Sequence, residues 1–452
     1  MKIDITIPQP NKGKFSEIKL GYDFENEKVE VLLNVNFKKL YAFTKRQIGV
    51  DFDVFLIGCI VYGIDILLPR KFSDNGWNRD IEVEFPVENP DIFNAGKDTL
   101  QEALSFLTGD SWIISFIQRD NFPLYSLSKK EKVYPEDFQK SHKKVSLFSG
   151  GLDSLIGVID QLTSSNDRMV LVSHYDGISV KGAQTDQNKI IDIFQKQYSN
   201  YHFVQTRVDL SRLDVNGNKI IKETTLRGRS FLFLCQAIFV AHSIDDGTEV
   251  LIPENGTISL NYPLTPSRIS SCSTRTAHPH YLNKVEEFIK IIGLNHSIKN
   301  KYEFKTKGEM LEECKDRNLI LKTYSLSCSC GKRGGRKDIR DNPKGTNHCG
   351  ICMPCIYRRV ALHKIGINEF IGTDIFDPQK RQLNELPDIP AFLDFMKRPL
   401  AIEEIERNLL ANGTLPLNKL REYADVVCRT RNEIKEWMKA KGSNEIKKIL
   451  GL

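Results

Sequence analysis

The chain has 452 residues, of which 40% are hydrophobic, and its 64 Lys and Arg residues exceed its 58 Asp and Glu residues for a formal net charge of +6. This length is too great for one compact core and predicts roughly two or three globular domains. The charge excess is small for the length, so it gives weak support for a nucleic-acid partner, although a local basic patch stays open.

Neither the N-terminal residues nor the most apolar stretch has the pattern of an exported or membrane protein. Residues 1–14 (MKIDITIPQPNKGK) lack the basic start and apolar core of a signal peptide. The apolar run at 54–64 (VFLIGCIVYGI) ends at Asp65 and is far shorter than the ~20 residues of a membrane span. We therefore expect a cytoplasmic protein with no membrane segment, in which 54–64 forms a buried strand pair or another core segment.

The chain contains ten cysteines, which we expect to be reduced thiols that serve as core residues or metal ligands. Cys59, Cys235, Cys314 and Cys428 stand alone among apolar or helical neighbours, which favours plain packing. Cys272 lies in a polar segment, and its role stays open between packing and function.

Residues 1–140 predict an α+β accessory domain. Short β-type runs at 3–7, 29–37, 80–87 and 111–117 are mixed with one helical pattern at 98–107 and with Pro, Asn and Gly breaks. This region carries no recognisable catalytic motif.

From 141 to 375 the pattern changes to alternating strands and helices. Strand patterns at 143–149, 168–176, 201–210 and 248–255 alternate with helical patterns at 151–162, 183–197 and 230–244. This alternation predicts an α/β fold with a doubly wound parallel sheet that binds its ligands at the carboxyl ends of the strands. Residues 376–452 predict helices, as a small bundle or as a cap on the α/β domain.

The turn between the first strand and the first helix of this α/β region reads Ser-Gly-Gly-Leu-Asp-Ser at 149–154. Consecutive N–H groups in a Gly-Gly turn, together with the positive end of a helix dipole, favour a phosphate. Ser149 and Ser154 add hydroxyl donors, and Asp153 is suited to hold Mg²⁺ or to orient the turn. The segment lacks the Lys of a GxxxxGK[ST] loop and the spacing of GxGxxG, and a tight structural turn is the alternative interpretation.

This hexapeptide resembles the pyrophosphate-binding loop of the PP-loop (N-type) ATP pyrophosphatases. These enzymes split ATP between its α- and β-phosphates and activate a substrate oxygen as an adenylate. The resemblance implies ATP as the cofactor but leaves the substrate open. It also implies that the pyrophosphate and Mg²⁺ are held by Ser149, Gly150, Gly151, Leu152, Asp153 and Ser154.

A cysteine cluster follows near the end of the α/β region. Cys349, Cys352 and Cys355 form C-x₂-C-x₂-C, and a fourth thiolate from Cys328 or Cys330 would complete a tetrahedral Zn²⁺ site. Four sulfur ligands leave no open position, so such a zinc would be structural. An iron–sulfur cluster and a metal-free loop are the alternatives.

The PP-loop and the cysteine cluster together resemble QueC, the 7-cyano-7-deazaguanine synthase family, over roughly residues 143–370. The resemblance implies Cys328, Cys349, Cys352 and Cys355 as zinc ligands, with Cys330 in reserve. Arg227, Arg229 and Ser230 match a Pro-Gly-Arg-Asn element that lines the family's nucleotide site, although a surface position for Arg227 is the alternative. Further implied roles are catalysis by Ser149, Asp153, Ser154 and Arg229, and contacts to adenine by Ser173, His174 and Tyr175.

The chain also departs from this family. Residues 1–140 and 376–452 have no counterpart in the compact biosynthetic enzyme, and the segment at 253–282 replaces the family's substrate segment. These features are closer to QueC-like proteins of bacterial antiphage systems, the QatC branch among them. That resemblance implies a protein partner from the same defence operon. The basic run at 331–348 predicts a solvated insertion in the zinc loop, or a contact to RNA, nucleotide or an acidic protein.

The leading hypothesis is an ATP-dependent enzyme that adenylates a deazapurine carboxylate in antiphage defence and passes it to ammonia or to an amine of a macromolecule. Donor-rich residues expected to bind this acid are Glu254, Asn255, Ser273, Thr274, Arg275 and His278, any of which could be structural. His278 could act as a base or could be a hydrogen-bonded loop residue. The alternatives are a tRNA-modifying PP-loop enzyme and a nucleotide-binding scaffold without catalysis.

Overall fold

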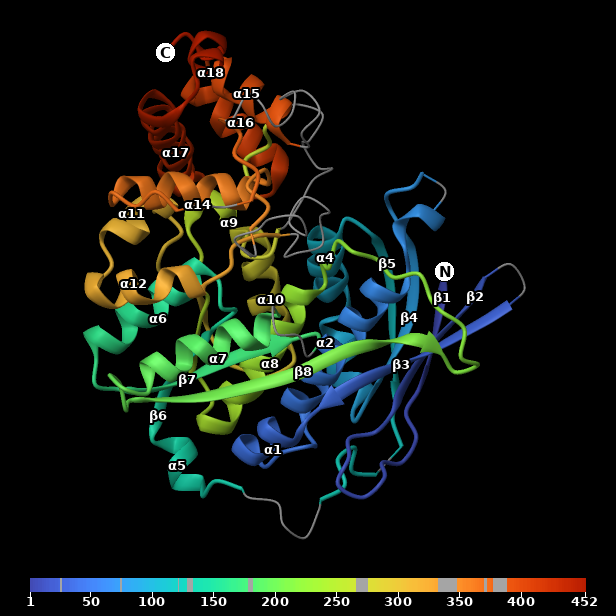
Figure 1. Cartoon of the computed structure of the whole chain (residues 1–452). Coiled ribbons are helices and arrows are strands. Elements are labelled where there is room, and N and C mark those ends of the chain that lie inside the picture. Colours follow the sequence, from blue (N-terminus) through green and yellow to red (C-terminus); the bar gives the residue numbers. More distant parts are fainter. Residues whose placement is uncertain are drawn as a thin grey trace.

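The computed structural model describes residues 1–24, 27–73, 75–120, 122–127, 133–177, 182–265, 275–331, 348–369, 372–376 and 388–452. A ten-stranded sheet in the order β10-β9-β6-β7-β8-β3-β2-β1-β4-β5 runs through the molecule (Figure 1). The strands are β1 (Lys2–Thr6), β2 (Ile18–Phe24), β3 (Glu27–Asn36), β4 (Asp80–Val87), β5 (Ser111–Gln118), β6 (His142–Leu147), β7 (Arg168–Tyr175), β8 (Tyr201–Asp214), β9 (Glu249–Leu251) and β10 (Ile298–Lys299).

Helices surround this sheet and extend beyond it at the C-terminus. The α-helices are α1 (Lys38–Thr44), α2 (Val50–Leu67), α3 (Pro90–Ala95), α4 (Lys97–Thr108), α5 (Glu136–Lys140), α6 (Leu152–Ser164), α7 (Ala183–Phe194), α8 (Arg229–Ile244), α9 (Gly256–Leu260), α10 (Pro279–Ile291), α11 (Lys307–Glu312), α12 (Arg317–Thr323), α14 (Met353–Lys364), α15 (Ile389–Lys397), α16 (Ile402–Asn412), α17 (Leu420–Lys441) and α18 (Asn444–Leu450). Short 3₁₀ helices are η1 (Arg70–Phe72), η3 (Tyr324–Leu326) and η5 (Leu417–Lys419).

The half of the sheet formed by β10, β9, β6, β7 and β8 is parallel throughout. Side chains of β7 alternate between its faces: Met169 and Leu171 join the core under α6 and α7, whereas Val170 and Val172 join the core under α2 and α8. Because both faces are covered, the strand is almost wholly apolar in its centre. The predicted α/β class with a doubly wound parallel sheet is confirmed.

The N-terminal strands continue the same sheet. β3 pairs antiparallel with β8, and β2, β1, β4 and β5 extend the sheet from there. One hydrophobic core contains Leu20 and Ile60 from the N-terminal region together with Val170 and Phe239 from the α/β region. The division predicted at residue 140 therefore rests on sequence pattern alone, because neither the sheet nor the core is interrupted there.

The apolar run at 54–64 lies in helix α2, which is buried along almost its whole length. The predicted core location is confirmed, but the strand-pair alternative is wrong. A helix buried on all sides shows no polar face, so its sequence cannot be told from buried strands by periodicity. Helix α2 crosses α8 closely, since a Cβ atom on Gly58 would lie 2.7 Å from Cys235 Cβ. Among the described residues, no helix is both long and apolar enough to cross a membrane.

The C-terminal helices α15 to α18 lie against α14, α9 and α11, as Figure 1 shows in orange and red. Their core includes Trp437 and Tyr423 of α17 and extends to the cysteines of the α/β region. Thr257 of α9 and Thr430 of α17 are joined by a 2.6 Å hydrogen bond between their hydroxyls. The helices expected in this region are present, and they pack both on one another and on the α/β region.

Candidate active site

The Ser-Gly-Gly-Leu-Asp-Ser segment forms the turn from β6 into α6, at the carboxyl edge of the parallel strands. Gly150 has φ +81°, a left-handed conformation that favours glycine. Ser154 Oγ donates to the Gly151 carbonyl at 3.0 Å and lies 3.1 Å from Ser149 Oγ. The first N–H groups of a helix have no partner within the helix, so the start of α6 presents donors suited to a phosphate.

Side chains from other elements hold this turn in place. The Gln187 amide of α7 donates to the carbonyls of Ser149, at 3.1 Å, and His174, at 3.2 Å. Gln205 of β8 donates to Gln187 Oε1 at 2.8 Å. The Cys328 N–H donates to the Gly150 carbonyl at 3.0 Å. Sequence reasoning missed Gln187, because a lone glutamine in an amphipathic helix carries no signal that it is buried.

Asp153, in the first turn of α6, is one member of a charged cluster at the turn. Lys307, the first residue of α11, is almost fully buried and lies with Nζ 2.5 Å from Asp153 Oδ2. Burial and the nearby Asp153 carboxylate raise the pKa of Glu254 well above its ordinary value. Two carboxyl groups and one ammonium group thus meet beside the start of α6, an arrangement suited to a divalent cation and a polyphosphate. Sequence reasoning missed Lys307, which is 154 residues from Asp153 in the chain.

Ser173, His174 and Tyr175 end β7 beside the turn, and all three are buried. Ser173 Oγ donates to the Phe148 carbonyl, and His174 Nε2 lies 2.8 Å from the Val208 carbonyl. Burial lowers the pKa of His174 to about 4, so the imidazole is neutral at pH 7 and Nε2 carries the proton. The side chains of Ser173 and His174 therefore bind the backbone of the fold, and a contact to adenine through this strand end stays a prediction.

Arg229 is the first residue of α8 and is exposed at the carboxyl edge of the sheet. Its positive charge contributes to the lowered pKa of His174, after the larger effect of burial, which places it near the end of β7. Arg227 has a different environment. Its Nη1 donates to the Thr108 carbonyl at 2.6 Å, and its guanidinium lies 4.5 Å from the centre of the Trp77 ring. The expected nucleotide contact of Arg227 is therefore corrected, because its buried guanidinium is bound to the N-terminal region.

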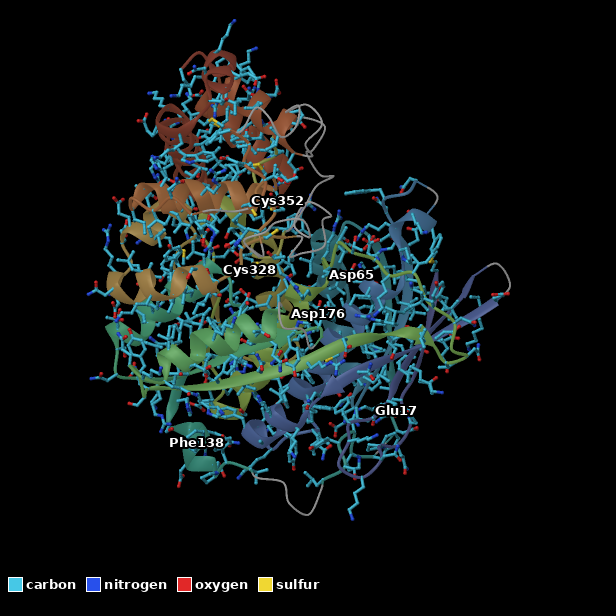
Figure 2. The ribbon with its side chains drawn as sticks, viewed as in Figure 1. Glu17, Asp65, Phe138, Asp176, Cys328 and Cys352 are labelled. Atoms are coloured by element: carbon cyan, nitrogen blue, oxygen red, sulfur yellow. The ribbon has the colours of Figure 1, made fainter. Side chains whose placement is uncertain are left out.

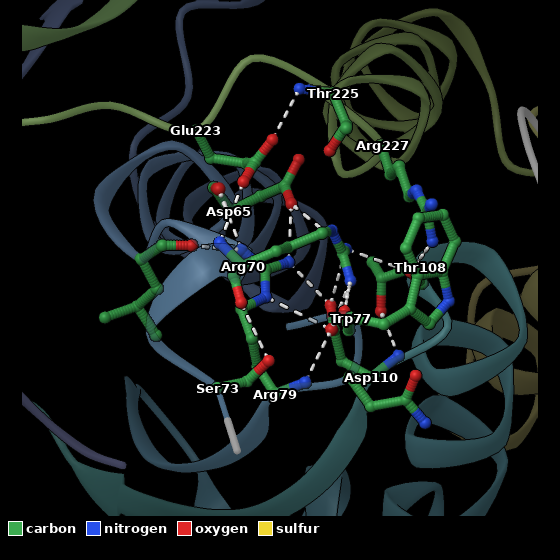
Figure 3. Close-up of polar contacts among 12 residues, drawn as sticks. Asp65, Arg70, Ser73, Trp77, Arg79, Thr108, Asp110, Glu223, Thr225 and Arg227 are labelled. Carbon is green, nitrogen blue, oxygen red and sulfur yellow. Dashed lines mark hydrogen bonds and ion pairs between the residues drawn. The ribbon is translucent and has the colours of Figure 1, made fainter. Parts of the chain in front are cut away.

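A buried group of charges, here called the Asp65 network, consists of Asp65, Arg70, Arg79 and Asp110 (Figure 3). Arg79 Nη2 lies 2.7 Å from Asp65 Oδ1 and 2.6 Å from Asp110 Oδ2, and Arg70 Nη1 lies 2.7 Å from Asp110 Oδ1. Burial alone would raise the pKa of Asp110, but hydrogen bonds and charge from Arg79 and Arg70 lower it.

The Asp65 network reaches the start of α8. Asp65 Oδ2 accepts a 2.8 Å hydrogen bond from the N–H of Gly228, the residue directly before Arg229. Asp65 lies in the last turn of α2, directly after the apolar run at 54–64, so the N-terminal region fixes the backbone that carries Arg229. The N-terminal region is thus part of the scaffold of the candidate site.

The residues expected to bind an acid substrate are only partly brought together. Asn255 is buried, with Oδ1 accepting from Ile258 N–H at the start of α9, and its amide donates to Glu254 Oε1 at 3.1 Å. Arg275 Nη1 donates to the Phe106 carbonyl at 3.0 Å, and its guanidinium lies over the Phe106 ring. Ser273, Thr274 and Cys272 lie outside the described residues.

His278 is fully buried at the start of α10, where its Nδ1 accepts from His280 N–H at 3.2 Å. Burial lowers the pKa of His278 to about 3. These contacts favour a hydrogen-bonded residue over a base, since the lone pair of Nδ1 is already used and the buried ring resists protonation.

Four cysteines form a buried cluster at the start of α14: Cys330, Cys349, Cys352 and Cys355 have Sγ atoms that all lie within 4.8 Å of one another. The Sγ–Sγ distance is 4.0 Å for Cys330 and Cys352 and 3.9 Å for Cys349 and Cys355. Ligands 2.3 Å from a tetrahedral zinc ion would be roughly 3.8 Å apart, so the donor set and its spacing could hold zinc.

The fourth thiol of this cluster comes from Cys330, and the expectation of Cys328 is corrected. The Cys328 N–H is bonded to Gly150, which holds this residue against the turn at 149–154, here called the phosphate turn after the ligand expected from its sequence. Cys330, two residues further on, reaches the other three thiols. Figure 2 labels Cys328 and Cys352 on the two segments concerned. Buried Arg358 of α14 supports the segment that contains Cys328 by donating to Ser327 Oγ at 2.9 Å.

Comparison with known proteins adds one relative. The chain is 23% identical over 241 residues to a 7-cyano-7-deazaguanine synthase of Methanococcus vannielii, and this match covers 50% of the chain and 96% of that enzyme. No family model matches the chain, and no solved structure matches it. The relative is a synthase, which supports an enzyme of the QueC-like kind and agrees with the parallel sheet and with the turn at 149–154 described above.

Proposed function

We propose that this chain is a QueC-like enzyme that uses ATP to adenylate the carboxylate of a 7-deazaguanine acid. The observation that carries the proposal is the phosphate turn at 149–154, set at the carboxyl edge of the parallel strands with Asp153, Lys307 and Glu254 beside it. The similarity to a 7-cyano-7-deazaguanine synthase supports the substrate class.

In the proposed reaction, a carboxylate oxygen of the acid attacks the α-phosphorus of ATP. The bond between that phosphorus and the bridging oxygen to the β-phosphate breaks, which gives an acyl-adenylate and pyrophosphate. An amine then attacks the acyl carbon, loses a proton and displaces AMP, so that an amide forms. With ammonia as the amine, activation of the primary amide by a second ATP and loss of AMP would lead to a nitrile.

The residues of the site have separate tasks in this reaction. The N–H groups at the start of α6 and the ammonium group of Lys307 would neutralise the leaving pyrophosphate. Ser149 would donate a hydroxyl hydrogen bond to it, while the Ser154 hydroxyl holds the turn by donating to the Gly151 carbonyl. Arg229, exposed at the start of α8, would bind a phosphate or the activated carboxylate through a charge-assisted hydrogen bond.

Two metal ions belong to the proposal. Mg²⁺ would be held with ATP by Asp153 and Glu254, because carboxylate oxygens are the donors that a hard cation favours, and a cation between the two would offset the repulsion from Asp153 that helps to raise the pKa of Glu254. When bound, Mg²⁺ screens the phosphate charge. Zinc would be held by Cys330, Cys349, Cys352 and Cys355, and four thiolate ligands give it a structural role.

The acceptor of the activated acid is proposed to be an amine on a partner protein, within an antiphage system. The match to the relative covers 96% of that enzyme but 50% of this chain, so much of the chain is additional to the part needed by the compact synthase. Binding of a macromolecular acceptor would be a role for these additional segments.

The experiment is an assay of the purified chain with ATP, Mg²⁺ and 7-carboxy-7-deazaguanine, in which pyrophosphate and AMP are measured. We expect both products to depend on the acid. Asp153→Asn should lower their formation by roughly 100-fold, since it removes the charge beside the phosphate turn, whereas Asp167→Asn, an exposed residue after α6, should leave it unchanged. Formation of ADP, or activity of Asp153→Asn equal to that of the control, would refute the proposal.

A further inference from the structure

Two histidines and an aspartate meet at the edge of the sheet opposite the phosphate turn. His242 lies in the last turn of α8, Asp246 lies in the connection from α8 to β9, and His296 lies just before β10. β9 starts beside Lys144, near the beginning of β6, so this group is at the amino ends of the parallel strands. The cysteine cluster and the candidate active site do not include these residues.

The potential ligand atoms of the three side chains converge. One atom from each residue lies within 4.8 Å of the other two. His242 Nδ1 is 3.3 Å from His296 Nε2 and 3.8 Å from Asp246 Oδ1. Two nitrogen ligands at ~2.0–2.1 Å from a tetrahedral zinc ion are roughly 3.3 Å apart, so the histidine pair has the spacing of a ligand pair.

His296 is oriented in the way that metal-binding histidines usually are. It is fully buried, and its Nδ1 lies 3.0 Å from the Thr248 carbonyl, which can only accept a hydrogen bond. Nδ1 must therefore carry the proton, and the lone pair of Nε2 faces His242. A backbone carbonyl that fixes the tautomer of a ligating imidazole is a recurrent outer-shell contact in metal sites.

Asp246 is also held by an outer contact. The Asn295 amide donates to its Oδ2 at 2.8 Å, and the Asn295 N–H donates to its Oδ1 at 3.2 Å. An aspartate is a carboxylate at neutral pH. Each oxygen keeps a second lone pair for a metal. The Asp246 side chain is 47% exposed and that of His242 is 22% exposed, so an ion can enter from solvent.

We propose that His242, Asp246 and His296 bind a divalent first-row transition metal ion, with Zn²⁺ as the first choice. Two imidazoles and one carboxylate suit such an ion, and three protein ligands leave a position for water. The ion would join the C-terminal end of α8 to the segment that leads into β10. This proposal does not rest on the proposed function, and the alternative is a hydrogen bond between the two imidazoles without any metal.

The test is a calorimetric titration of ZnCl₂ into the chain after treatment with EDTA and its removal, combined with elemental analysis of the zinc that remains. We expect one zinc ion per chain beyond the one bound by the cysteine cluster. Cys330→Ser should lose the cysteine-bound zinc and keep this second binding event. His242→Gln and Asp246→Asn should weaken the second event by roughly tenfold or more.

The matched control is Asp245→Asn, which removes the same charge from the neighbouring exposed residue. It should leave the titration unchanged. A wild-type chain that binds no zinc beyond the cysteine cluster would overturn the proposal, and so would equal zinc affinity for Asp246→Asn and Asp245→Asn. Since His242 and Asp246 are partly exposed, circular dichroism of the metal-free variants should match wild type, which separates loss of binding from loss of fold.

Discussion

The N–H of Cys328 donates a 3.0 Å hydrogen bond to the carbonyl of Gly150. This bond joins the segment that leads into the cysteine cluster to the turn that follows β6, over a separation of 178 residues in the chain. Cys330 enters the cluster two residues later. A metal ion bound by the four cysteines would therefore support the phosphate turn through the backbone of 328–330, without touching the nucleotide.

The four-cysteine arrangement predicts different results for two neighbouring cysteines. Cys330→Ser should lose one zinc ion per chain relative to wild type, because it removes one of four converging thiols. Cys328→Ser should keep its zinc, because the contact of residue 328 to the turn is made by the backbone. Elemental analysis by mass spectrometry measures both. Loss of zinc from Cys328→Ser alone would restore the assignment expected from the sequence.

Lys307 gives a test of the charged cluster at the phosphate turn. Lys307→Gln should lower ATP turnover by roughly tenfold or more, since it removes the buried cation beside Asp153. Steady-state kinetics at varied ATP measures the effect on kcat and KM, and Lys301→Gln, at an exposed position, is the matched control. Thermal unfolding of both variants shows whether the fold is kept. Full turnover by a folded Lys307→Gln would remove this residue from the site.

The Asp65 network predicts a large effect on stability. Asp65→Asn leaves Arg79 without one of its two buried carboxylate partners and should lower the free energy of unfolding by about 3 kcal/mol. Urea denaturation measures this value, and Asp80→Asn on the exposed side of β4 should change it little. Equal denaturation midpoints for the two variants would show that the network contributes nothing net.

The buried His174 predicts a loss of stability in mild acid. Its pKa is lowered to about 4 in the folded chain by burial, against about 6.5 when unfolded. The unfolded state binds more protons between these values, so stability is full above about pH 6.5 and falls as the pH drops toward 4. Near pH 5, the wild-type chain should take up close to one proton at residue 174 when it unfolds. His174→Gln should lose this uptake, which lowers the slope of the unfolding free energy against pH. Urea denaturation at several pH values measures the slope, and an unchanged slope in the variant would contradict the assignment.

The sequence predicted the strands, turns and helices whose formation depends on neighbouring residues. The strand, glycine turn and helix around Ser149 were predicted from a few adjacent residues, and so was helix α4. The apolar run in α2 was placed in the core, but its helical form was not separated from a strand pair because the helix has no polar face.

The contacts that complete the candidate site are long-range, and no local signal marks them. Lys307, Gln187 and Asp65 meet their partners through sheet order and helix packing, which a single sequence does not display. Similarly, Cys328 and Cys330 have the same short-range context, and their separate roles come from which of them faces the turn. Arg227 and Arg229 are a similar case: they look equivalent in the sequence, but Arg227 is buried against Trp77 and Arg229 is exposed.

The central claim is that the acid attacks the α-phosphorus of ATP, and oxygen labelling tests it most directly. The chain would be incubated with ATP, an amine and 7-carboxy-7-deazaguanine labelled with ¹⁸O in both carboxylate oxygens, and AMP would be examined by mass spectrometry. An oxygen from the carboxylate becomes the bridge to phosphorus and leaves with AMP, so AMP should carry a single ¹⁸O. Unlabelled AMP, or ADP and phosphate in its place, would contradict acyl-adenylate chemistry at this site.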